Sequence, residues 1–323
     1  GKGVEYFNGN DNEPVPNLIY STSHIKNGYQ VKSAGDINGD GKTDLLTSGY
    51  ICSDYAPYIF YNNNGFGFDS SWFTCSYDYN DQPYRISVNA AGDVNNDGYD
   101  DFLVGGLGKN FTENNPTASA VRLFYGNNNM LYYDTTYVYS VDSNIWVNNF
   151  TQDSCDFGRS LAPLGDINGD GFDDFAISVN STGYVVFGKA SGFSPLLSLS
   201  SLDGNNGFQL MDSFSVNSAG DVNGDGFNDL AIIAADTSYV VFGKASGFSS
   251  TVNLSGLDGE TGFRLDNRSN NHNDDSRFLS ASSAGDINGD GFDDLIIETF
   301  TDHNINHYIV FGKASGFGPK FEL

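Results

Sequence analysis

The sequence has little positive charge. Only 15 lysine and arginine residues stand against 41 aspartate and glutamate residues among 323, so the formal net charge is −26. Such a surface repels phosphate backbones and anionic lipids, which argues against nucleic acids and membrane surfaces as partners. No apolar run approaches the roughly 18–20 residues of a membrane-spanning helix. The chain opens Gly-Lys-Gly-Val with no basic-then-apolar signal segment, and we interpret it as a mature form or an excised piece.

Cysteine is also scarce, and three cysteines cannot all pair within one chain. Cys52 and Cys75 fall in the same repeat unit and could form one local disulfide, while Cys155 stands alone. Alternatively, all three are small buried hydrophobic side chains, so the cysteines do not indicate a compartment. Disorder is excluded by 26 phenylalanines and 19 tyrosines, which supply ample apolar area for a core. With 39 glycines and few helix-favouring stretches, the composition favours short strands and many turns.

Two motifs alternate along the chain. The first is an aspartate-rich loop of the form Asp-x-Asn-x-Asp-Gly-x-x-Asp, found five times at intervals of 55 to 73 residues; its first aspartates are Asp36, Asp93, Asp166, Asp221 and Asp286. The second is Tyr-Val-Val-Phe-Gly-Lys-Ala-Ser-Gly-Phe, which begins at Tyr184 and Tyr239 and, with one isoleucine, at Tyr308. An internal repeat of this length is typical of propellers and solenoids.

Each unit is predicted to hold four short strands, because β-branched and aromatic runs alternate with glycine, asparagine and serine. One strand enters the loop, as at 214–220, and a second leaves it, as at 230–233. Tyr-Val-Val-Phe forms the third, and a run such as 196–199 is expected to be the fourth. Four strands per unit indicate a propeller blade. We predict an all-β fold, a single β-propeller domain over 1–323, with terminal strands in 1–32 and units beginning near 33, 90, 163, 218 and 283.

A propeller also explains the small residues before each loop, for example Ala34-Gly35 and Ala219-Gly220. If that strand is innermost, small side chains let several blades meet near one axis, and a sandwich gives no such reason. Five blades are favoured from the five loops.

The aspartate-rich loop carries the predicted chemistry. Hard oxygen ligands at positions 1, 3, 5 and 9, a backbone carbonyl at position 7 and glycine at position 6 suit Ca²⁺. The predicted side-chain ligands are Asp36, Asn38, Asp40, Asp44, Asp93, Asn95, Asp97, Asp101, Asp166, Asn168, Asp170, Asp174, Asp221, Asn223, Asp225, Asp229, Asp286, Asn288, Asp290 and Asp294. The carbonyl donors would be Lys42, Tyr99, Phe172, Phe227 and Phe292.

An EF-hand is the rival assignment, and it requires a bidentate glutamate at position 12. That position holds Thr47, Val104, Ile177, Ile232 and Ile297, so the loop is predicted to join strand to strand. The alternative is that the aspartates form turns without metal, which five complete copies make improbable. Five Ca²⁺ ions would change the formal net charge from −26 to about −16.

The two alternating motifs resemble the FG-GAP repeat of integrin α-subunit propellers and of many secreted proteins. The matching residues are the aspartate-rich loops and the Phe-Gly of Tyr-Val-Val-Phe-Gly, and the resemblance covers nearly the whole chain. It implies calcium at the turn between the first and second strands of a blade, in an extracellular or cell-surface setting. The family includes adhesion receptors, lectins and enzyme-attached propellers, so the fold alone does not choose among them.

The two ends of the chain do not balance. Val4–Gly9 resembles the third-strand motif, so third strands outnumber loops by one. In one hypothesis, Pro16–Tyr20 becomes the outer strand of the last blade and closes the ring. In the other, a terminal half-blade docks on a neighbouring subunit and builds a head-to-tail assembly.

No nucleophile elbow, zinc-protease motif or phosphate-binding loop occurs, so we predict no enzyme. We predict instead an extracellular, calcium-stabilised structural or adhesive module, with a protein or glycan ligand and self-assembly through its terminal strands. The alternatives are a lectin-like propeller, whose sugar-stacking candidates are Trp72, Trp146, Tyr77, Tyr79, Tyr132 and Tyr133, and an accessory propeller of a secreted enzyme. Five sequons suggest glycosylation, at Asn110, Asn149, Asn180, Asn253 and Asn267.

Overall fold

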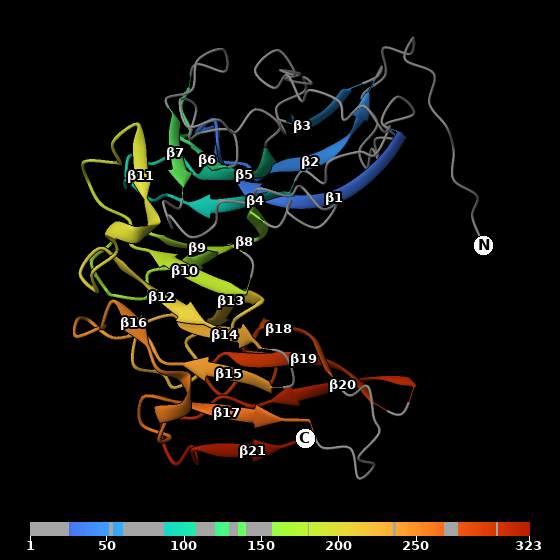
Figure 1. Ribbon diagram of the computed structural model, residues 1–323, viewed down its shortest axis with the longest axis vertical. Helices are drawn as coiled ribbons and strands as arrows, with labels where there is room; N and C mark the ends of the chain where they lie inside the picture. Colours follow the sequence, from blue (N-terminus) through green and yellow to red (C-terminus); the bar gives the residue numbers. More distant parts are fainter. Residues whose placement is uncertain are drawn as a thin grey trace, which may run out of the picture.

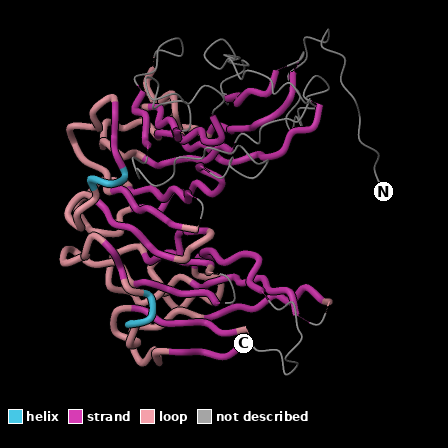
Figure 2. Tube along the Cα trace, in the orientation of Figure 1, coloured by secondary structure: helices cyan, strands magenta, loops and turns pink. Residues whose placement is uncertain are grey.

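The computed structural model describes ten stretches of the chain, at 26–51, 54–60, 87–107, 120–128, 135–139, 157–179, 181–234, 237–267, 277–301 and 303–323. These residues form strands, turns and two short 3₁₀ helices, η2 (Leu199–Ser201) and η3 (Leu254–Gly256), which are the cyan segments of Figure 2. The fold is an all-β β-propeller, as the strand patterning predicts.

The strands form five sheets in chain order. The first blade contains β1 (Lys26–Gly35), β2 (Asp44–Ile51) and β3 (Asp54–Phe60). The second contains β4 (Ser87–Gly92), β5 (Asp101–Leu107), β6 (Ala120–Phe124) and β7 (Thr135–Tyr139). The third contains β8 (Phe157–Gly165), β9 (Asp174–Val179), β10 (Thr182–Val186) and β12 (Gly207–Met211).

The fourth blade contains β13 (Ser215–Gly220), β14 (Asp229–Ile233), β15 (Thr237–Val241) and β17 (Gly262–Asp266). Three strands of the fifth are described, β18 (Arg277–Gly285), β19 (Asp294–Thr301) and β20 (Asn304–Val310). Within every blade these strands pair antiparallel in sequence order. The loop therefore always joins strand one to strand two, which excludes an EF-hand helix after it.

One strand assignment was wrong. The run 196–199 was expected to be a fourth strand of its own blade, but β11 (Leu196–Ser198) pairs parallel with β7 of the preceding blade. The same holds for β16 (Thr251–Val252) on β12 and β21 (Lys320–Glu322) on β17. After each Phe-Gly turn the chain thus reaches back to the blade before it. The fourth strand comes later, from Gly-Phe-x-Leu segments such as Gly207–Leu210.

The innermost strands of successive blades lie side by side, in the order β1, β4, β8, β13 and β18. Figure 1 shows the sheets following one another in a curve, with β1–β3 at the upper right and β18–β20 at the lower right of the view. The small residue predicted for this crowded edge is fully buried at Ala34, Ala91 and Ala219. Side chains between adjacent sheets make the core, so each blade is stabilised mainly by its neighbours.

Candidate functional site

The five loops share one hydrogen-bonding pattern, clearest in the third blade. The backbone N–H of Asp170 donates to Asp166 Oδ1 at 3.1 Å and to Asn168 Oδ1 at 3.0 Å. The N–H of Gly171 donates to Asp166 Oδ2 at 2.9 Å, and that of Phe172 to Asp170 Oδ1 at 3.0 Å. The other loops repeat these bonds. Oxygens of positions 1, 3 and 5 are thereby gathered on one side of a tight turn.

The aspartate at position 9 lies beneath this turn and is fully buried in all five blades. In the third blade Asp174 Oδ2 accepts the N–H of Ile167 at 3.0 Å, and Oδ1 accepts that of Gly188 at 2.8 Å. Asp101, Asp229 and Asp294 make the equivalent pairs of bonds. The carboxyl therefore ties the loop to the Phe-Gly turn of its own blade.

Burial raises the pKa of Asp101, Asp174 and Asp229 to about 8, against the opposing effect of their backbone hydrogen bonds. In each case the aspartates at positions 5 and 1 of the same loop raise the pKa further by repulsion. Three carboxyls per loop are thus electrostatically coupled. A nearby cation would favour their charged forms and so lower these pKa values.

The predicted ligand sets have the chemistry of a calcium site, with hard oxygens and a glycine-permitted turn. Within the described stretches, no group of three histidine, cysteine, aspartate or glutamate side chains is drawn together closely enough to hold a metal by itself. An ion would need the asparagine at position 3 and the carbonyl at position 7 as well, as the sequence predicts. The residue types of the loop suit the ion, and its binding is taken up below as a proposal.

Position 8 of the loop joins neighbouring blades, a role that the sequence reasoning missed. The N–H of Asp36 donates to Asp100 Oδ2 at 2.6 Å, and the N–H of Asp100 donates back to the Asp36 carbonyl at 3.1 Å. In the same way Asp173 Oδ2 accepts the N–H of Asp93, and Asp293 Oδ2 accepts the N–H of Asp221. In the fourth blade the equivalent residue is Asn228, whose Nδ2 donates to the Leu164 carbonyl. The available signal was the recurrence of Asp or Asn immediately before the last loop aspartate.

The Phe-Gly turn makes the second connection between blades. The N–H of Lys189 donates to the Val94 carbonyl of the preceding loop at 2.8 Å, and Lys244 and Lys313 do the same with Ile167 and Val222. Glycine is required here, since a Cβ on Gly188 would lie 2.4 Å from the Asp173 carbonyl oxygen. The Phe-Gly turn therefore makes a contact between blades as well as accepting the buried aspartate of its own loop.

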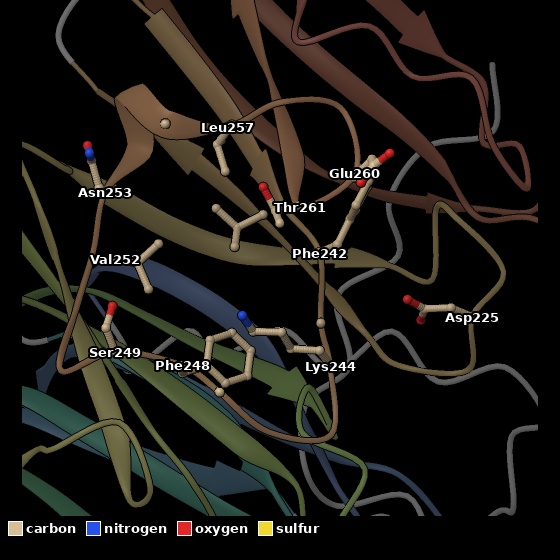
Figure 3. A pocket seen from close by; sticks show the side chains of 14 residues that line it. Asp225, Phe242, Lys244, Phe248, Ser249, Val252, Asn253, Leu257, Glu260 and Thr261 are labelled. Atoms are coloured by element: carbon tan, nitrogen blue, oxygen red, sulfur yellow. The ribbon is translucent and has the colours of Figure 1, made fainter.

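A pocket of about 280 Å³ lies in the fourth blade, between its Phe-Gly turn and the segment around η3 (Figure 3). Phe248, Val252, Leu257 and Thr261 line it. The Phe248 ring is already stacked on Phe208, with centroids 4.8 Å apart, and the Lys244 ammonium lies 4.9 Å from its centroid. The Phe248 ring is thus part of the packing between blades.

Several predicted sites lie outside the described residues. These are Cys52, Cys75 and Cys155, the six aromatic sugar-stacking candidates, the terminal segments 4–9 and 16–20, and the sequons at Asn110, Asn149 and Asn180. Asn253 is exposed and accepts the Ser255 N–H at the start of η3. Asn267 instead donates its Nδ2 to Thr301 Oγ1 at 2.8 Å, so a glycan there would displace an existing bond.

Comparison with known proteins agrees with this architecture. A family model described as FG-GAP-like repeat matches residues 36–104, and the FG-GAP repeat model matches 157–187, 214–246 and 278–298. Integrin alpha-PS3 of Drosophila melanogaster is 31% identical over 156 residues, which cover 46% of this chain and 13% of that one. Integrin alpha-8 of Mus musculus is 30% identical over 182 residues, covering 53% and 15%. The chain thus matches only a small part of these relatives.

Among solved structures, an Agrocybe aegerita lectin, described as recognising non-reducing terminal N-acetylglucosamine, superposes with a TM-score of 0.50 at 14% identity. The match covers 92% of this chain and 66% of the lectin, and it bears on the fold alone. The described part of the chain has no helix long and apolar enough to cross a membrane. The chain therefore carries FG-GAP repeats and folds as a β-propeller.

Proposed function

We propose that this chain is an extracellular or cell-surface, non-enzymatic module, stabilised by five calcium ions, that serves in adhesion or as a structural part of a larger assembly. The observation that carries the proposal is the repeated loop, in which oxygens of positions 1, 3 and 5 gather above a buried aspartate. The integrin relatives support the adhesive role, because the shared repeats are those of adhesion-receptor subunits.

Calcium would act on stability. Each ion would relieve the repulsion among three coupled carboxyls and would bind only the folded loop, so its binding free energy adds to the free energy of unfolding. At an ion concentration one hundred times Kd, one site contributes about 2.7 kcal/mol. Five blades in one propeller remain part of this proposal, as does one ion per loop.

The test is thermal unfolding in excess calcium and in excess EDTA. We expect a large fall in Tm on chelation, and calorimetric titration of the metal-free protein should count five sites. The variant Asp170→Ala removes an exposed loop ligand and should lower the count by one. Asp203→Ala, a change of an exposed aspartate outside the loops, is the matched control. A melt that EDTA leaves unchanged would contradict the proposal.

Carbohydrate binding is the second candidate, favoured by the likeness of the fold to a lectin and by Trp72 and Trp146 among the sugar-stacking candidates of the sequence. A glycan array on the calcium-loaded protein distinguishes it from the structural module. Saturable binding of one glycan class by a monomer would favour the lectin. An array without binding, with assembly in solution, would favour the structural role.

A further inference from the structure

The aspartate at position 1 organises each loop, and the next blade holds it in place. In the second loop Asp93 Oδ1 accepts the N–H of Asp97 at 3.0 Å, and Oδ2 accepts that of Gly98 at 2.8 Å. The backbone of Asp93 is fixed from outside the loop. Its N–H donates to Asp173 Oδ2 at 3.0 Å, and its carbonyl accepts the N–H of Asp173 at 3.3 Å. Both backbone polar groups of a predicted calcium ligand are therefore bonded to position 8 of the third blade.

The same pair of bonds occurs at two further contacts between blades. Asp100 holds Asp36 of the first loop, and Asp293 holds Asp221 of the fourth loop. The carboxylate packs closely against the start of the loop that it holds. A Cβ on the glycine just before position 1 would lie 2.1 or 2.2 Å from a carboxyl oxygen, at Gly35, Gly92 and Gly220.

The third loop lacks this carboxylate, because position 8 of the fourth blade is Asn228. The N–H of Asn228 still donates to the Asp166 carbonyl at 3.2 Å. Its side-chain Nδ2 donates to the Leu164 carbonyl at 3.0 Å, where the aspartates of the other blades instead accept the N–H of position 1. The ligand types are the same in all these loops, so the chain contains its own comparison between a charged and a neutral position 8.

We propose that the position-8 side chain of each blade is a positioning residue for calcium in the loop of the blade before it. Asn228 accordingly leaves the third loop with the weaker form of this support. The inference rests on the calcium binding proposed above and deepens it. Groups that orient a metal ligand typically change the affinity for the metal by about 10–100-fold. A carboxylate beside position 1 also adds negative charge close to the ligands, which favours a cation there.

A purely structural role for position 8 makes different predictions. If these side chains only joined blades, exchanging aspartate and asparagine would change the stability of the metal-free protein and leave the affinity for calcium unaltered. If position 8 acted on its own loop, the affected site would be the loop that contains it. The two swaps described below separate these possibilities, because each changes one position 8 into the residue that another blade already carries.

The first swap is Asn228→Asp, measured by calorimetric titration of the metal-free protein with calcium. We expect one site to bind calcium at least about tenfold more tightly. Adding Asp170→Ala, which removes a ligand of the third loop, should abolish this gain. Adding Asp225→Ala, which removes a ligand of the fourth loop, should leave it in place. Urea unfolding in EDTA should show no added stability, because without calcium the new charge faces other carboxylates.

The second swap is Asp173→Asn, which gives the third blade the position-8 residue of the fourth. We expect one site to bind calcium at least about tenfold more weakly. This loss should disappear in the Asp97→Ala background, where the second loop already lacks a ligand, and should persist with Asp170→Ala. Asn205→Asp is the matched control, since it makes the same change of charge at an exposed residue outside the loops and should leave the affinities unchanged.

The outcomes separate this inference from the calcium proposal. Wild-type protein that binds calcium with affinities that neither swap alters would overturn the inference alone. A gain in Asn228→Asp that disappears with Asp225→Ala would also overturn it, since position 8 would then act on its own loop. Wild-type protein that binds no calcium would overturn the calcium proposal and this inference with it.

Discussion

Asp174 lies where the loop, the second strand and the Phe-Gly turn of the third blade meet. Its side chain is fully buried, and each carboxyl oxygen accepts one backbone N–H, from Ile167 and from Gly188. The bonding requires two acceptors at this position. The aspartate at position 9 therefore has a structural role whether or not its loop binds a metal, which accounts for its presence in every blade.

Asp174→Asn tests that requirement. The amide keeps the shape of the side chain but turns one acceptor into a donor facing a buried N–H, which should cost about 1–3 kcal/mol. Urea unfolding in EDTA measures the change without a metal contribution. Asp212→Asn is the control, since Asp212 is exposed and its φ of 56° suits asparagine. Equal stability of the two variants would show that the carboxyl is not needed as a double acceptor.

At the scale of the element, the last strand is attached by charge as well as by backbone bonds. In β21 the Lys320 ammonium lies 2.6 Å from Asp266 Oδ2 in β17, and Arg264 donates to the other oxygen. Burial alone would raise the pKa of Asp266, but the bonds from Lys320 and Arg264 outweigh it and hold the pKa below its ordinary value. The charged form is therefore the one that the folded strand pair favours.

The sign of the pH dependence follows. Because the folded-state pKa is lowered, this contribution is present above the unfolded value of about 3.9 and is lost as the pH falls below it. We expect hydrogen exchange at Lys320–Glu322 to accelerate on acidification relative to β17, and Asp266→Asn to give fast exchange at neutral pH. Glu322→Gln is the control, because Glu322 is 3.6 Å from Lys320 and half exposed. The same exchange rate in all three proteins would contradict the prediction.

The sequence alone predicts the strands that flank each loop, since their apolar runs are short, β-branched and bounded by glycine. It does not place 196–199 correctly, because three residues such as Leu-Leu-Ser carry no information about which sheet they join. The blade before them offers a free outer edge, and tertiary pairing decides the matter. The role of position 8 is missed for a related reason. An aspartate next to a predicted metal ligand is naturally assigned to the loop, although Asp100 bonds to a different blade.

At the scale of the whole molecule, each blade is stabilised by the side chains that it packs against the adjacent blades. The third and fourth blades have both faces packed, so their strands lose protection only when two contacts open. Blades that interact only with their neighbours behave as a linear array, in which the ends open first. Ile287, Ile296 and Phe311 of the fifth blade are 42 to 54% exposed, so this blade is one such end, whereas a closed ring would have no end.

Hydrogen exchange of the chain at low concentration distinguishes the two cases. In a linear array, amides of β19 should exchange well before those of β9 and β14, although all three are second strands leaving the same loop motif. The comparison is internally controlled, because the three strands share their neighbours within the blade and differ in whether another blade covers them. Equal protection of the three strands would mean that the first and fifth blades are covered in solution. Residues of the same chain would then have to cover Ile287, Ile296 and Phe311.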